Sequence, residues 1–100
     1  MEEKYGPVVE LLSKTFDYEL IVPDKKTEED FIREAVEKLT PVIEYLLDKD
    51  YNRLLAILYR IDVNENKLKE CFAGTGFTDV AACIAKSVVE RQMMKVKLRG

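Results

Sequence analysis

The feature that most constrains this chain is an apolar stretch at its centre, residues 51–63, which reads YNRLLAILYRIDV. Its middle, residues 54–59, has no polar group apart from the hydroxyl of Tyr59. Leu and Ala dominate there, so a helix is favoured over a buried strand. Asp50 stands at the N-cap position. A helix that is apolar on most of its circumference must be surrounded, so we predict that it is the central helix, with Leu55 and Leu58 in the core.

Length and composition predict a single helical domain over residues 1–100. The chain has 100 residues, of which 47% are hydrophobic and 35% charged, which is typical of a globular protein. No uncharged apolar run approaches the roughly 18 residues that a membrane span needs. The first ten residues contain acids and no apolar core, unlike a secretory signal. We therefore expect a cytoplasmic protein without a membrane span.

The first helix is predicted to begin at Gly6-Pro7, because a proline at the first helical position loses no hydrogen bond. From Phe16 to Val22 apolar and acidic residues partly alternate, which leaves open a helix end, a strand or a connector. A lone strand would have nothing to pair with. We interpret the segment as a frayed helix end followed by an extended connector, with a turn at residues 23–26.

A long second helix follows, capped by Thr27. Its apolar residues fall within an arc of about 160° on the helical wheel, and they keep that phase across Pro41. A proline removes one backbone hydrogen bond and crowds the preceding turn. The pattern therefore predicts one helix that is kinked at Pro41 and ends near Leu47.

Two shorter patterns complete the chain. Asn64 is expected to cap a helix over residues 65–72 that stops at Gly74, and Thr78 to cap a last helix over residues 79–95. The loop around Gly74 and Gly76 lacks the preceding strand and the lysine of a phosphate-binding loop. The predicted fold class is all-α: a single small irregular bundle of about five helices.

The residues that commonly carry chemistry are scarce. The chain has no histidine and two cysteines, Cys71 and Cys83. We expect both to be reduced, structural thiols rather than a disulfide, because no export signal is visible. Two cysteines and carboxylates are a poor ligand set for zinc. We therefore expect no metal and no cofactor, and an enzyme ranks last among the possible functions.

Charge is distributed unevenly along the chain, whose net charge is −3. Residues 1–50 carry 14 acids and 7 bases, a net of −7, whereas residues 51–100 carry 5 acids and 9 bases, a net of +4. The two halves can attract each other, or the basic half can meet an acidic partner. Arg60 and Asp62 follow the apolar helix and are candidates for structural ion pairs, for instance between Arg60 and Glu44 or Asp48. An anion clamp at Arg60 is the alternative.

The last helix changes face along its length. Its core face ends near Val88, and beyond it Arg91, Gln92 and Lys95 occupy the same line. A second apolar strip, Val89, Met93 and Val96, continues alongside. Exposed apolar strips that are rimmed by charge mark interaction sites. The alternative is that the first helix or the segment 16–22 covers the strip.

Two runs, LLAILYRIDVNENKL and IAKSVVERQMMKVKLR, resemble a family of small, uncharacterised bacterial helical proteins. In that family a Leu-rich helix ends in YRIDV and a C-terminal helix ends in an E-R-Q-x-x-K-V-K stretch. The resemblance covers roughly residues 45–99. It implies a single helical domain in the cytoplasm, and it implies no reaction, ligand or partner.

Two functions follow from the last helix. The first is a non-catalytic protein-interaction module, homodimeric through this helix, that uses Val89, Met93 and Val96 with Arg91, Lys95 and Lys97 at the rim. The alternative is binding to nucleic acid or an anionic surface through the same bases. The overall acidity and the absence of an aromatic platform near these bases weigh against the alternative.

Overall fold

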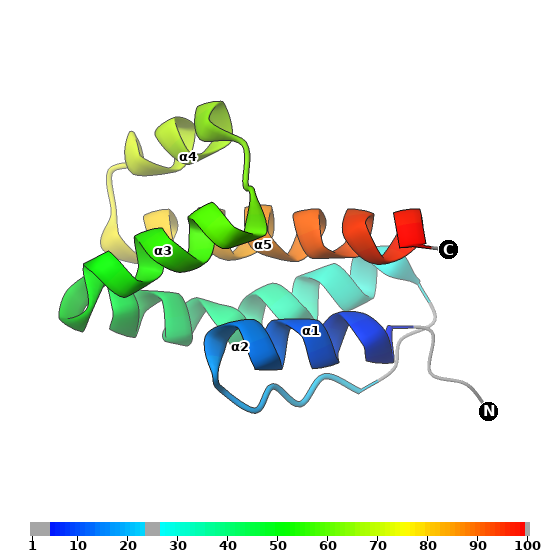
Figure 1. Ribbon diagram of the computed structural model, residues 1–100. Helices are drawn as coiled ribbons and strands as arrows, with labels where there is room; N and C mark the ends of the chain where they lie inside the picture. Colours follow the sequence, from blue (N-terminus) through cyan, green and yellow to red (C-terminus); the bar gives the residue numbers. More distant parts are fainter. Residues whose placement is uncertain (1–4, 24–26, 100) are drawn as a thin grey trace.

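The computed structural model describes residues 5–23 and 27–99, with the side chain of Arg99 excepted; these residues form five α-helices and no strand (Figure 1). The helices are α1 (Gly6–Phe16), α2 (Glu28–Lys49), α3 (Tyr51–Ile61), α4 (Glu65–Phe72) and α5 (Phe77–Arg99). The predicted all-α fold is confirmed. The turn predicted at residues 23–26 lies mostly outside the described residues.

Helix starts follow the predicted caps in three of four cases. The side-chain oxygens of Thr27, Asp50 and Asn64 accept hydrogen bonds of 2.8–3.3 Å from backbone N–H groups two or three residues later. These bonds satisfy donors that the first helical turn leaves free. The predicted cap at Thr78 is wrong, because α5 already begins at Phe77 and the Thr78 hydroxyl donates to Glu44 Oε2 at 3.1 Å.

Helix α2 is continuous through Pro41, as predicted. Its buried residues are spaced three or four apart and so share one face: Phe31, Ala35, Leu39, Ile43 and Leu46. Pro41 has no N–H to donate to the carbonyl oxygen of Glu37, four residues earlier. Both residues are exposed, so this carbonyl oxygen can bond to water. The kink at Pro41 stays a prediction.

The segment after α1 is a connector, one of the three alternatives considered for it. Asp17 ends α1 in the left-handed conformation, with φ of 50°, which aspartate tolerates better than most residues. The Leu20 N–H then donates to Ser13 Oγ at 3.0 Å, and the Leu20 side chain is buried. The connector is thus fastened to α1 and closes one edge of the core.

The central helix is α5, not α3. Each of the other four helices packs against α5, and the contact with α2 is the most extensive. In Figure 1, α5 runs between α4 above it and α2 and α1 below it. The molecule is 41 Å long. At 1.5 Å per residue α5 spans about 34 Å and α3 only about 16 Å, so α3 is too short to run along the whole molecule.

Helix α3 buries one face only. Leu54, Ile57, Leu58 and Ile61 are buried. Leu55, by contrast, keeps 40% of its surface exposed and Tyr59 keeps 86%. The prediction that α3 is surrounded is therefore wrong, as is the core position of Leu55, whereas the core position of Leu58 is confirmed.

Candidate functional site

The apolar strip predicted on the last helix lies largely inside the molecule. Val89 and Met93 are buried in the core, and Val96 is half-buried against it. Gln92 is buried as well, and its Nε2 donates to Thr15 Oγ1 of α1 at 3.5 Å. Helix α1 thus covers this side of α5. The prediction that Val89 and Met93 are exposed is wrong, and the alternative, cover by the first helix, describes the packing.

The bases predicted to rim that strip are partly engaged. Arg91 pairs with Asp62, and Lys97 pairs with Glu28 at the start of α2. Lys95 is half-buried and forms no ion pair with a described residue. Two of the three bases therefore join α5 to other elements.

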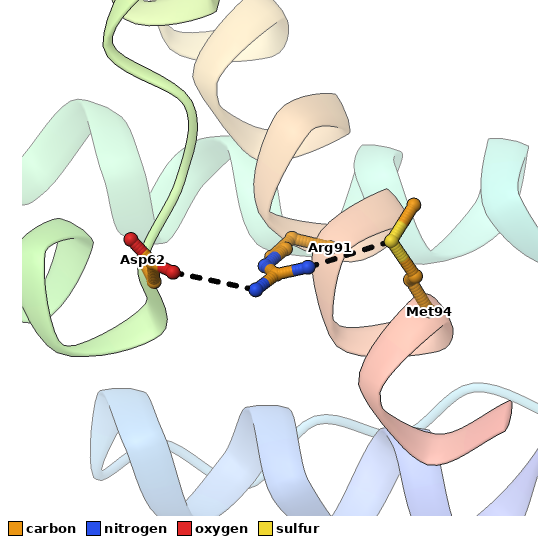
Figure 2. Close-up of polar contacts among 3 residues, drawn as sticks. All are labelled: Asp62, Arg91 and Met94. Atoms are coloured by element: carbon orange, nitrogen blue, oxygen red, sulfur yellow. Dashed lines mark hydrogen bonds and ion pairs between the residues drawn. The ribbon is translucent and has the colours of Figure 1, made fainter. Parts of the chain in front are cut away.

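Asp62, one of the two predicted ion-pair candidates, pairs with Arg91 of α5. Its carboxylate accepts from Arg91 Nη2 at 3.4 Å, and Arg91 Nη1 donates to Met94 Sδ at the same distance. Figure 2 shows the guanidinium lying between these two side chains. Asp62 ends α3 with a positive φ of 66°, which turns the chain toward α4.

Arg60 is exposed and forms no ion pair with Glu44, Asp48 or another described residue, so its predicted structural pairing is wrong.

A surface hollow of about 530 Å³ lies beside this ion pair. Its wall comes from the α3–α4 loop, the start of α4 and the middle of α5: Asp62, Val63, Asn64, Lys67, Ser87, Glu90, Arg91 and Met94. Two acids and two bases balance its charge. The Ser87 hydroxyl donates to the Cys83 carbonyl oxygen at 3.0 Å, and no described carboxylate or amine bonds to it. The arrangement therefore offers no activated nucleophile.

The two cysteines form a disulfide, which contradicts the prediction of reduced thiols. Cys71 of α4 and Cys83 of α5 are bonded, with their Cα atoms 5.3 Å apart. Cys71 is buried and the Cys83 residue is exposed. Ser87 Oγ lies 3.8 Å from Cys71 Sγ. The expectation failed because it rested on the compartment and on local apolar neighbours, whereas the bond depends on how α4 folds back onto α5.

The most prominent feature that the sequence analysis did not single out is an exposed apolar stripe on α3. Tyr51, Leu55 and Tyr59 recur every four residues and are all exposed. They fall within about 80° of the helical wheel, beside the buried face rather than on it. The ring of Phe72, at the end of α4, meets that of Tyr51 edge-on, with centroids 6.3 Å apart.

Helix α4 extends this apolar surface. Leu68 and Phe72, one turn apart, line a shallow hollow of about 450 Å³ together with Glu65, Lys69 and Ala73. We refer to Tyr51, Leu55, Tyr59, Leu68 and Phe72 as the α3–α4 face. Four of these side chains are exposed and Leu68 is half-buried. Large apolar side chains that stay exposed in a cluster, rather than singly, mark interaction surfaces. Their four-residue spacing is visible in the sequence, but the apolar run that contains them suggested full burial.

Two other kinds of site are not found in the described parts of the chain. No helix there is long and apolar enough to cross a membrane. Residues 5–23 and 27–99 also bring together no group of three or more histidine, cysteine, aspartate or glutamate side chains that could hold a metal ion.

Comparisons with known proteins give no assignment. No protein-family model, no curated protein and no solved structure matches the chain.

Proposed function

We propose that the protein is an interaction module that binds a second copy of itself through the α3–α4 face. The observation that carries the proposal is the exposed stripe of Tyr51, Leu55 and Tyr59, which Phe72 of α4 extends. Burying such side chains is favourable by about 25 cal/mol per Å² of apolar surface. Tyrosine and phenylalanine are also enriched in the buried centres of protein interfaces.

The spacing of the stripe suits a two-fold partner. Tyr51 and Tyr59 lie four residues on either side of Leu55. If two α3 helices pack antiparallel with Leu55 on the axis, Tyr51 of each copy faces Tyr59 of the other. A closed two-fold dimer requires such a self-complementary surface. Each aromatic pair formed would add about 0.5–1.5 kcal/mol beyond the area that it buries.

The charge of this region also permits self-association. Residues 51–72 carry four bases and three acids, a net of +1. Two copies of a nearly neutral surface repel each other little, whereas like charges that face each other oppose association. The charge pattern therefore favours a second copy over a strongly charged partner.

Binding to nucleic acid or an anionic surface through the end of α5 is less well supported. Arg91 and Lys97 already pair with Asp62 and Glu28. A phosphate backbone would have to compete with both acids, and affinity for nucleic acid depends on the number of phosphates that free bases neutralise. We therefore place the interaction on α3 and α4.

Sedimentation equilibrium tests the proposal. The wild type is expected to dimerise at high micromolar concentration, and Tyr59→Glu to weaken the dimer at least about tenfold, or ~1.4 kcal/mol. Because Tyr59 is 86% exposed, this change should leave the monomer folded, as circular dichroism can check. Ile21→Glu is the matched control, since Ile21 is exposed and lies outside the α3–α4 face. A wild type that stays monomeric, or equal weakening by both variants, would contradict the proposal.

A further inference from the structure

We infer that the Cys71–Cys83 disulfide is a site of reversible thiol–disulfide exchange, and that its reduction by a dithiol releases α4 from the body of the protein. The inference concerns how α4 is held and does not depend on the proposed self-association. It starts from the small amount of packing that α4 contributes and from the unequal exposure of the two cysteines.

Helix α4 has few anchors of its own. Among its eight residues Cys71 alone is buried, and Leu68 is half-buried. The remaining six, Glu65, Asn66, Lys67, Lys69, Glu70 and Phe72, are exposed. Isolated helices shorter than about 12–15 residues are marginal in water, so an eight-residue helix must be held by tertiary contacts.

The disulfide is the covalent attachment of α4 to α5, in addition to the packing of the two helices against each other. The bond joins the single buried residue of α4 to Cys83 in the N-terminal third of α5. Apart from the packing of Cys71 and Leu68 against the core, Phe72 meets Tyr51 edge-on, and the Asn64 cap fixes the start of the helix but not its position on the body. Without the bond, α4 is held by Cys71, Leu68 and its two flanking loops.

The exposure of the two cysteines sets the direction of attack. Cys83 is exposed whereas Cys71 is buried, so a thiolate can approach Cys83 Sγ. Attack forms a mixed disulfide at Cys83 and expels Cys71 as a thiolate. The second thiol of the dithiol then displaces Cys83 and closes the reagent's own disulfide. Two electrons and two protons pass to the protein, and the dithiol is oxidised.

Release of α4 changes two surfaces. Asn64 and Lys67 form part of the wall of the 530 Å³ hollow, which would open. Phe72 would also leave its place beside Tyr51, so the α3–α4 face would lose its α4 half. The buried core of α2 and α5 does not include α4 residues other than Cys71, so it should persist.

Hydrogen exchange of the full chain tests this inference, with dithiothreitol as the reductant. Before reduction, native protein should show no thiol that iodoacetamide labels. Reduction should speed exchange of the amides of residues 68–73 at least about tenfold, while residues 81–93 of α5 keep their protection. Cys83→Ser, which removes the bond at its exposed end, should exchange as fast as the reduced wild type and not respond to dithiothreitol.

Three results would overturn the inference. Labelling of both cysteines before reduction would show that the bond does not form. Unchanged exchange of α4 after reduction would show that packing, not the bond, holds the helix. Loss of protection throughout α2 and α5 would show that the bond supports the whole fold rather than α4. Failure of the dimer in sedimentation would leave all three readouts unaffected.

Discussion

Leu55 and Leu58 of α3 show how one turn of a helix separates a core residue from a surface residue. Leu58 is fully enclosed, whereas Leu55 is 40% exposed. The two positions differ by 300° on the helical wheel, or 60° the other way, which is enough to pass from the buried face to the stripe. The two leucines are thus expected to contribute very differently to the stability of the monomer.

Alanine substitutions at these positions should separate the two roles. Leu58→Ala removes buried methyl groups and leaves a cavity, so it should lower the free energy of unfolding by about 2–5 kcal/mol. Leu55→Ala should cost about 1 kcal/mol or less at concentrations where the protein is monomeric, because the side chain is already partly hydrated. Urea denaturation of both variants measures the difference. Equal losses would place Leu55 in the core after all.

At the scale of the element, the starts of the helices follow from residues close in sequence, whereas the position of each helix in the bundle depends on contacts between distant segments. Thr27, Asp50 and Asn64 cap the helices that they were predicted to cap, because a cap is made within three residues of the chain. The prediction of the central helix was wrong, because the apolar content of a helix does not reveal which other helices pack against it. The disulfide and the ion pair between Asp62 and Arg91 were not predicted, because each joins segments of the chain that only the fold brings together.

The end of α5 provides a matched pair of substitutions. Met93 is 4% exposed and Met94 is 52% exposed, although the two are adjacent. Met93→Glu places a carboxylate in the core and should lower the free energy of unfolding by about 3 kcal/mol or more, or prevent folding. Met94→Glu should stay within about 0.5 kcal/mol of the wild type, and its carboxylate can pair with Arg91. If Met93→Glu is stable and instead alters self-association, α1 does not cover this side of α5.

At the scale of the whole molecule, α3 and α4 together present a cluster of exposed large apolar side chains. Helix α5 contacts all four other helices, and α3 with α4 presents exposed tyrosine, leucine and phenylalanine side chains. Other exposed apolar side chains, such as Ile21 and Tyr45, are not part of this face. The fold class and most helix starts could be predicted from periodicity and caps, whereas α5 begins two residues before the predicted residue 79 and ends four residues after the predicted residue 95. The α3–α4 face could not, because whether an apolar residue is buried depends on which neighbours reach it.

The position of Leu55 on the proposed two-fold axis can be measured most directly by cross-linking. A Leu55→Cys variant brings the two introduced thiols together at that axis, where Cα atoms about 4.4–6.8 Å apart allow a disulfide. Mild oxidation should therefore convert this variant to a covalent dimer on a non-reducing gel, with Cys71 and Cys83 occupied by their own bond. The exposed control Ile21→Cys should stay largely monomeric. Cross-linking of Leu55→Cys no faster than that of Ile21→Cys would contradict a dimer built on α3.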